Sequence, residues 1–480
     1  MLELAAIILY FVAILTIGIF SFSRKQNSSD FIIGNRSMNY WLTALAAHAS
    51  DMSSWLFMAY PAMIFIFGLN KIWIAAGLIL CMYCNWQFIA PKIRIATEKS
   101  NSLTFFSYLE HRFHDKSGLL RIFTALICFI FYTIYISAGL VGLGLLVSSL
   151  FPLSFHWAVF VSIILALPYV LIGGYRTLAW LDLFQGLFLM IIIVCVPYLL
   201  FATVGGMAGI KKSAAIHEIS LQIMPNLSLR GVFEVGLIAL GWGLGYFGQP
   251  TIITKFMGIK DPSKIAKSKY VGMSWMLISL IAATFVGLIG IPFFNGTLEN
   301  PEMIFIDMVK SSFHPFFIGL ILCAVFAASI NVMCSQILVV CSTLTEDIYK
   351  KIFRNAASSK ELLLVSRLGV LFISLLAFLI AYFKISSIYS LVLYSWSGLG
   401  ASFGPLLIFS LYSKKPDKRS AWAGIIAGSC SSAVWPWFNS KFAFNLDPII
   451  VGFSLSSLSI LTSSYLKKRE NKEEISPQLE

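Results

Sequence analysis

A single carboxylate lies near the middle of a long apolar stretch, residues 40–69. Asp51 stands there within a short run of small polar residues that includes Ser50, Ser53 and Ser54. An ionisable side chain at the centre of a membrane-spanning segment costs about 2.5–3.5 kcal/mol, so it rarely occurs without a partner or a function. The pattern predicts an interrupted helix whose freed carbonyl oxygens, beside an acid, can coordinate a cation.

A second interruption is predicted five spans later, in residues 241–250. This run combines several glycines with Trp242, Tyr246, Gln249 and Pro250. Because glycine costs about 1 kcal/mol and proline about 3 kcal/mol in a helix interior, the helix should unwind there. Two broken helices separated by an odd number of spans enter the membrane in opposite senses, which places a site at the bilayer midplane. The alternative is that the glycines only allow close helix packing.

These two segments belong to a chain that is apolar almost throughout. Of its 480 residues, 58% are hydrophobic and 12% are charged, which predicts an integral membrane protein. Thirteen stretches are long enough to cross a hydrocarbon core of about 30 Å at about 1.5 Å per residue. They are residues 3–22, 40–68, 72–91, 122–148, 155–173, 178–203, 231–253, 271–293, 314–345, 363–383, 386–411, 420–438 and 448–466.

Basic residues indicate how the spans are oriented. One set of alternate connections holds only seven of the 35 lysines and arginines, namely Lys71, Lys211, Lys212, Arg230, Lys310, Lys384 and Lys441. The other set holds nearly all of the rest, which predicts the N-terminus outside and the C-terminus in the cytoplasm. The net charge of +13 is then a topology signal, and a nucleic-acid partner is not expected because no soluble basic domain is present. Residues 1–466 are predicted to form one transmembrane domain, and residues 467–480 a short charged tail.

A membrane enzyme and a transporter-like sensor are the alternative classes. An enzyme would need convergent acids, bases or metal ligands, but of the six histidines only His48 lies deep in a span. A sensor normally needs a signalling domain, for which the tail is too short. The eight cysteines fall inside apolar spans and indicate packing rather than disulfides. We therefore expect a carrier in a lipid bilayer, with no cofactor and no obligate protein partner.

Several short motifs occur in a fixed order along the chain. They are residues 49–53 (Ala-Ser-Asp-Met-Ser), 131–135 (Phe-Tyr-Thr-Ile-Tyr), 172–174 (Ile-Gly-Gly), 242–250, 345–350 (Thr-Glu-Asp-Ile-Tyr-Lys) and 404–405 (Gly-Pro). In this order they resemble the sodium/solute symporter family, from about Phe31 to beyond Lys415. The unbroken run 242–250 is most similar to the proline branch of that family.

This resemblance implies an all-α integral membrane fold of the LeuT type. Ten core helices would form two inverted repeats of five, at about 40–203 and 231–411, with one span before them and two after. Each repeat would start with a discontinuous helix. The function that the resemblance implies is secondary active symport of L-proline with Na⁺, by alternating access, across a bacterial inner membrane.

The resemblance also implies a substrate pocket. The residues expected to line it are Ser53, Ser54, Tyr135, Trp242, Tyr246, Gln249 and Pro250. The aromatic faces of Trp242 and Tyr246 can enclose an apolar ring and attract its ammonium group. Asp51 matches the essential acid of the family, and Arg36 matches an arginine at the inner approach to the sodium route.

The expected sodium site departs from the family pattern. Relatives build it from carbonyl oxygens at the first break and on the ninth span, together with two adjacent hydroxyls. The matching positions are Ala49, Met52 and Ala328 for the carbonyls, and Asn331 and Val332 for the hydroxyls. An asparagine oxygen can bind a hard cation, but valine offers no ligand, so water must substitute or the coordination number falls. Ser335 and Asp182 resemble the region that forms a second ion site in some relatives.

This departure leaves the coupling ion open. His48 lies one helical turn from the first break, and because histidine titrates near neutral pH it could carry a proton instead of sodium. The alternative for His48 is a neutral ring that donates to a helix carbonyl. Uncoupled facilitation is the third alternative. Ser54 and Trp41 differ from the proline branch, so another small amino or organic acid remains the alternative substrate.

Overall fold

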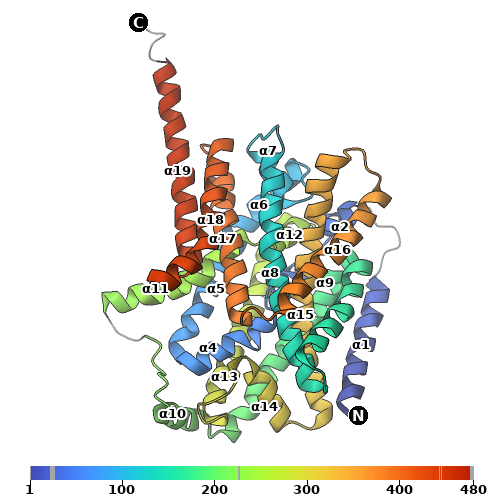
Figure 1. Cartoon of the computed structure of the whole chain (residues 1–480), viewed down its shortest axis with the longest axis vertical. Helices are drawn as coiled ribbons and strands as arrows, with labels where there is room; N and C mark the ends of the chain where they lie inside the picture. The colour runs from blue at the N-terminus through green and yellow to red at the C-terminus, as the bar shows by residue number, and fades with distance from the viewer. Residues whose placement is uncertain (1, 22–27, 225–227, 443, 445, 476–480) are drawn as a thin grey trace.

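A computed structural model describes residues 2–21, 28–224, 228–442, 444 and 446–475. The described residues are almost entirely helical and contain no strand; two extended residues, Met38 and Ile259, form an isolated parallel bridge. Long helices stand roughly side by side in one bundle (Figure 1). The all-α prediction is therefore confirmed.

The helices fall into long and short groups. The long ones are α1 (Leu2–Ser21), α5 (Ile72–Cys84), α8 (Leu119–Leu150), α9 (Phe155–Thr203), α11 (Leu229–Gly243), α13 (Ile265–Phe293), α15 (Pro315–Ser342), α16 (Ser359–Tyr382), α17 (Ile388–Tyr412), α18 (Lys418–Phe442) and α19 (Pro448–Ile475). The short ones are α2 (Ser28–Ile33), α3 (Tyr40–Ala49), α4 (Ala59–Phe67), α6 (Ala90–Lys99), α7 (Phe105–Arg112), α10 (Gly206–Ile216), α12 (Pro250–Gly258) and α14 (Ile304–Ser312). Tighter or wider turns join them, of which η1 (Gly34–Arg36), η2 (Ser54–Leu56), η4 (Asn85–Ile89), η5 (Leu244–Gly248), η7 (Pro301–Met303) and η8 (Thr343–Phe353) matter below.

Ten of the predicted spans are helical segments that are long and apolar enough to cross a membrane. The other three predicted spans are the broken pair α3–α4, the shorter apolar segment Phe155–Leu171, and α18. Two predicted spans, 155–173 and 178–203, are joined in α9, where Gly174 takes a φ of 71° and interrupts the helix. Glycine carries that left-handed conformation without the steric cost that a side chain would add.

The first predicted break is present between α3 and α4. Asn39 caps the start of α3 by accepting a hydrogen bond from Leu42 N at 2.9 Å. The helix ends at Ala49, and the Ser50 hydroxyl turns back to donate to the carbonyl of Ala46. Ser53 then caps η2, because its Oγ accepts from Trp55 N at 3.2 Å. The Ser53 hydroxyl thus satisfies a backbone N–H in place of a helix bond, which is how such residues compete with a continuous helix.

The second predicted break is present between α11 and α12. After α11 the chain tightens into the 3₁₀ turn η5 and becomes extended at Gln249 (φ −85°, ψ 107°). The next helix, α12, begins with Pro250 in its first turn, where proline fits best. Close packing also explains the glycines. A Cβ on Gly245 would lie 1.9 Å from the Trp396 indole nitrogen, and one on Gly248 would lie 2.5 Å from a backbone oxygen of α17. The run therefore breaks the helix and also allows close packing, and the alternative that its glycines serve packing alone is wrong.

The two broken helices lie side by side and run in opposite directions. Met38, just before α3, pairs with Ile259, just after α12. At the other side of the breaks, the rings of Trp55 and Trp242 lie 5.0 Å apart. The start of one broken helix therefore meets the end of the other, as inverted repeats require.

The start of α1 and the end of α19 lie at opposite ends of the bundle, which agrees with an odd number of crossings (Figure 1). We call the end that carries α2, α6 and α7 the basic face, since Arg36, Arg94 and Arg121 lie there. Figure 1 shows this end on the same side as the end of α19. That it faces the cytoplasm stays a prediction.

Candidate functional site

The two breaks meet at one hydrogen bond. Tyr246, on η5, donates its hydroxyl proton to Oδ2 of Asp51 at 2.5 Å. Tyr246 is buried and Asp51 is half-buried. A short bond from a hydroxyl to a carboxylate is among the stronger hydrogen bonds in proteins, and here it joins the first elements of the two predicted repeats. The predicted acid and the predicted pocket tyrosine are thus direct neighbours.

Backbone oxygens are available beside this bond. Among the described residues, no backbone N–H outside a helix donates to the carbonyl of Ala49 or of Met52. Both residues are buried, and α15 packs against α3 and η2. Buried carbonyl groups are normally paired, so unpaired ones at a helix break indicate ligands for a cation.

The α15 residues predicted for the ion site are all buried, namely Ala328, Asn331, Val332 and Ser335. Within the described chain, the Asn331 amide nitrogen and the Ser335 hydroxyl have no hydrogen-bond partner. Val332 offers no polar atom. Because the amide of an asparagine can turn to present its oxygen, Asn331 fits a sodium ligand, whereas Val332 leaves that position to water or empty.

Aromatic rings fill the side of the breaks away from the basic face. Trp55 stacks on Tyr60 at 5.1 Å and contacts Trp242 at 5.0 Å. The Trp242 indole donates to the hydroxyl of Tyr389 at 3.3 Å. The indole nitrogen of Trp55 is buried and unpartnered within the described structure. This aromatic cluster, Trp55, Tyr60, Trp242 and Tyr389, therefore keeps one donor unused.

The other predicted pocket residues surround the breaks less directly. Tyr135 lies on α8, 6.4 Å from the ring of Tyr132, which in turn bonds the hydroxyl of Thr251 just after the second break. Ser54 faces α8, where a Cβ on Gly142 would lie 2.6 Å from its hydroxyl oxygen.

The last members of the predicted pocket shape the two breaks. Gln249 donates its amide to the carbonyl of Trp396 at 3.4 Å, and Pro250 opens α12 after the second break. At the first break, Ser53 uses its hydroxyl as the cap of η2. The polar groups of Gln249 and Ser53 are therefore already engaged in holding the backbone at the breaks.

Asp182, predicted near a second ion, has a partner. Its Oδ2 accepts from Nζ of Lys255, on α12, at 2.8 Å, and the side chains are 1% and 4% exposed. This pair joins α9 to α12, and so links the two predicted repeats.

His48 lies in an apolar setting. Its Nε2 accepts from the indole N–H of Trp86 at 3.1 Å, and its ring is 6.2 Å from that of Trp275. A tryptophan N–H only donates, so Nε2 must be unprotonated in this arrangement. The Nδ1 atom has no partner among the described residues. This geometry suits a neutral packing histidine better than a proton carrier.

Arg36 joins the basic ends of several helices. It donates to the backbone oxygens of Thr97 (3.0 Å), Ser102 (2.8 Å) and Met257 (3.2 Å). Burial lowers the pKa of Arg36 from its usual value, and the neighbouring charge of Arg94 lowers it further. Since arginine has a very high reference pKa, the side chain stays charged and closes the basic face around the ends of α6 and α12.

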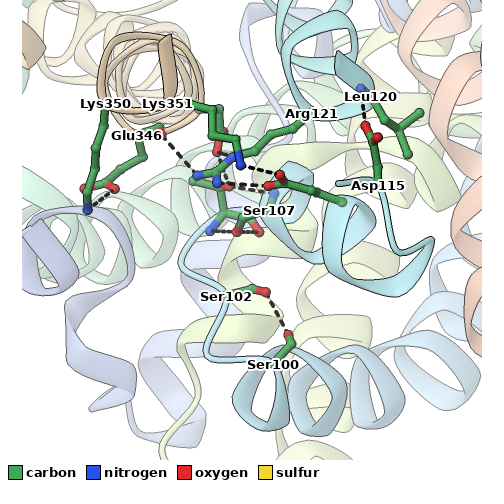
Figure 2. A network of polar contacts seen from close by, with 12 residues as sticks. Ser100, Ser102, Ser107, Asp115, Leu120, Arg121, Glu346, Lys350 and Lys351 are labelled. Carbon is green, nitrogen blue, oxygen red and sulfur yellow. Dashed lines mark hydrogen bonds and ion pairs between the residues drawn. The ribbon is translucent and has the colours of Figure 1, made fainter. Parts of the chain in front are cut away.

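A network of charged groups extends this closed region (Figure 2). Arg121 bonds Asp347 at 2.5 Å and Glu110 at 3.1 Å. Figure 2 also shows Lys350 paired with Glu346, at 2.9 Å. Beside it lies a cavity of about 770 Å³ lined mainly by polar and charged side chains. The network joins α7, α8 and η8.

Sequence reasoning missed several residues of the site. Asn85 donates to the Tyr246 carbonyl at 2.9 Å, and Trp396 donates to the Trp242 carbonyl at 2.8 Å. Asn85 and Trp396 both carry a hydrogen-bond donor inside a predicted span, and this feature could have identified them as site residues. Lys255 was counted only as a loop charge, although it follows Pro250 by five residues and belongs to the broken helix.

Known proteins match this chain over nearly its full length. The high-affinity proline transporter PutP of Bacillus subtilis is 39% identical over 457 residues, covering 94% of this chain and 95% of the relative. The osmoregulated proline transporter OpuE of the same organism is 37% identical, covering 97% and 94%. The sodium/proline symporter of Escherichia coli is 36% identical, covering 96% and 92%.

Solved structures share the fold. A Na⁺-coupled sialic acid symporter in an outward-open state has a TM-score of 0.81 at 17% identity, covering 97% of this chain and 98% of that one. MhsT in complex with L-phenylalanine has a TM-score of 0.58 at 14% identity, covering 88% and 97%. The nucleobase-cation-symport-1 transporter Mhp1 has 0.57 at 13%, covering 92% and 95%. The predicted LeuT-type architecture is thereby confirmed.

The family model for the sodium:solute symporter family matches residues 31–428. This match covers both broken helices, the Asp51–Tyr246 bond and the α15 residues beside it. The family consists of transporters rather than enzymes. Together with relatives 36–39% identical over almost the whole chain, it shows that this protein belongs to the sodium:solute symporter family.

Proposed function

We propose that this protein imports L-proline together with Na⁺ by alternating access across a bacterial inner membrane. The observation that carries the proposal is the meeting of two helix breaks at the Asp51–Tyr246 hydrogen bond, with free carbonyls on one side and an aromatic cluster on the other. The names of the relatives, which are proline transporters and sodium/proline symporters, support the substrate and the ion.

The aromatic cluster fits a small zwitterion with an apolar ring. Trp55 and Trp242 offer faces that attract an ammonium group and enclose a pyrrolidine. The unpartnered Trp55 indole N–H can donate to a carboxylate, and the N-terminus of α12 at Pro250 adds a positive dipole end. These features favour an amino acid over a neutral solute.

The proposed sodium ion lies between the first break and α15. Its ligands are the carbonyl oxygens of Ala49, Met52 and Ala328 and the side-chain oxygen of Asn331. Oxygen ligands of this kind suit a hard cation. Val332 contributes nothing, so water completes the shell. Asp51 balances the charge from the other side of the break.

Alternating access is proposed to open one end of this site at a time. The basic face corresponds to the cytoplasm, with the N-terminus outside, because it carries most of the basic residues. Arg36 controls this inner route, since it ties the ends of α6 and α12 together. Inner opening must therefore break its hydrogen bonds.

Proton coupling is the alternative that the sequence left open. A proton on Nε2 of His48 would remove the acceptor that Trp86 uses, inside an apolar environment. The unpaired carbonyls and the Asn331 amide favour sodium instead. We therefore place sodium first.

The test is uptake of labelled proline into proteoliposomes under an inward sodium gradient, and separately under an inward proton gradient. We expect accumulation with sodium alone. Accumulation with protons alone would overturn the sodium assignment. No accumulation under either gradient would overturn proline as the substrate, and labelled glycine betaine and pantothenate would then be the next candidates. Asp51→Asn serves as the inactive control.

A further inference from the structure

The buried ion pair Lys255–Asp182 has no role in the carrier as described so far. Nζ of Lys255 and Oδ2 of Asp182 lie 2.8 Å apart, and the side chains of Lys255 and Asp182 are 4% and 1% exposed. The Tyr175 ring lies 5.2 Å from Nζ of Lys255 and covers the pair further. Inside a bundle that spans a membrane, a charge so deeply buried requires an opposite charge close by.

The pair lies next to the proposed sodium site. Gly186 follows Asp182 by one helical turn, and a Cβ on it would lie 3.0 Å from the Cβ of Ala49, whose carbonyl is a proposed ligand. The ion-site helix α15 packs against both α9 and α12, which carry the pair. The Ser335 hydroxyl on α15 is buried and unpartnered within the described chain. A buried carboxylate close to one cation site would ordinarily favour a second cation.

We propose that Lys255 is a tethered cation that occupies Asp182 in place of a second sodium ion. This inference rests on the proposed sodium coupling. An ammonium group satisfies the carboxylate as a sodium ion would, but it is covalently held and is never released. Lys255 therefore sets the number of sodium ions that the protein binds.

Because the Lys255 ammonium takes the place of a sodium ion, Asp182 is neutralised throughout the transport cycle. A sodium ion at Asp182 would leave in each cycle, and the empty carboxylate would then favour one conformation over the other. With Lys255 bound, the charge is balanced at every step, so this acid adds no sodium dependence to the transition. Asp182 and Lys255 then act as a constant strut between α9 and α12.

The test counts sodium ions bound to the purified full-length protein, by equilibrium binding of ²²Na⁺. Lys255→Met removes the ammonium and keeps the length of the side chain. We expect this variant to bind one more sodium ion per protein than the unaltered protein. The added Asp182→Asn change should abolish the gain, because it removes the carboxylate ligand.

A matched control is Lys269→Met. Lys269 on α13 is also 4% exposed, but it bonds Gln87 at 2.7 Å instead of a carboxylate. It should leave the sodium count unchanged. An equal count in folded Lys255→Met and in the unaltered protein would overturn the proposal.

The double variant keeps the proposal falsifiable if Lys255→Met does not fold. Removing both charges leaves no unpaired buried ion, so Lys255→Met/Asp182→Asn should fold. We expect it to bind as many sodium ions as the unaltered protein, and a smaller number would show that Asp182 is itself a sodium ligand. The absolute sodium count tests the proposed function, which fails if the unaltered protein binds no sodium. The difference in count between Lys255→Met and the unaltered protein tests the role of Lys255.

Discussion

The centre of the bundle and its basic face hold the same two broken helices together by different means. At the centre, one tyrosine–carboxylate bond and a set of ring contacts join them. At the basic face, Arg36, just before α3, donates to the carbonyl of Met257 on α12, and Arg94 of α6 donates to the carbonyl of Ile259 at 2.7 Å. Among the described residues, a direct backbone bridge between the two broken helices is present only at the basic face, between Met38 and Ile259.

The two regions also differ in which polar groups lack a hydrogen-bond partner. Near the centre of the described structure these groups are neutral, namely the Asn331 amide, the Ser335 hydroxyl and the Trp55 indole. At the basic face, Arg36 and Arg121 make several bonds each, and the atoms without a hydrogen-bond partner, Nη1 of Arg94 and Oδ2 of Asp347, belong to ion-paired side chains. Buried neutral groups are normally paired, so those at the centre are available to a ligand. Under the proposed function, we infer that the centre selects the cargo and that the basic face controls its exit.

The largest effect is expected for Asp51→Asn. The amide keeps the shape of the side chain but removes its charge and the strong acceptor for Tyr246. Sodium-driven uptake should fall by about 100-fold or more, since hydrogen bonds to charged groups contribute about 1.5–3 kcal/mol each and the ion loses its counter-charge. The measurement is initial uptake in proteoliposomes. Glu234→Gln is the control, because Glu234 is an exposed acid that pairs with the exposed Arg230, and the change should leave uptake unaltered.

Tyr246→Phe should have the next largest effect. It keeps the ring and removes only the hydroxyl that joins the two breaks. We expect sodium-dependent proline affinity to fall by roughly 10-fold, from the loss of one charge-assisted hydrogen bond. Titration of uptake against sodium checks this. An unchanged sodium dependence would break the comparison, because the centre would then not depend on its single bond.

Arg36→Ala tests the basic face. Loss of its bonds to the ends of α6 and α12 should shift the population towards the form open at this face. Because coupling energies of this kind are about 1–3 kcal/mol, uptake should fall several-fold while proline binding in detergent changes little. Hydrogen exchange should rise at residues 97–102 and 257–260. Arg230→Ala, which removes an exposed arginine, should leave exchange there unaltered.

The smallest effect is expected for Val332→Thr. It supplies the hydroxyl that the proposed sodium site lacks, at nearly the same volume. The sodium concentration for half-maximal uptake should fall by a few-fold, since one added oxygen ligand in a solvated shell replaces water. Val332→Ala is the matched variant, which makes room without adding a ligand. Equal sodium dependence in the two variants would place the ion away from this position.

The broken helices were predictable because their cause is local. Serines around Asp51 and the glycine-proline run before α12 weaken a helix wherever they occur, so their sequence was enough. The same holds for the spans, because length and apolar composition decide whether a segment can cross a bilayer. The interruption of α9 at Gly174 falls at the predicted boundary between spans 155–173 and 178–203, but the left-handed conformation of this glycine was not predicted.

The side-chain pairings were not predictable from the sequence. Asp182 was expected near an ion, but whether it meets sodium or Lys255 depends on how α9 packs against α12, 73 residues further along the chain. His48 was expected to be a candidate proton carrier because it is a histidine in a span. Its contact with Trp86, on a different helix, decides which ring nitrogen is free.

The sequence by itself determined that this protein lies in a lipid bilayer, where its two helices break, and which family motifs it carries. Each of these features depends on composition or on a few consecutive residues. Tertiary structure alone decided that Tyr246 meets Asp51, that Arg36 closes the ends of α6 and α12, and that Lys255 neutralises Asp182. Each of these contacts joins residues far apart in the chain. Their geometry follows from the packing of the two repeats against each other, which no local pattern encodes.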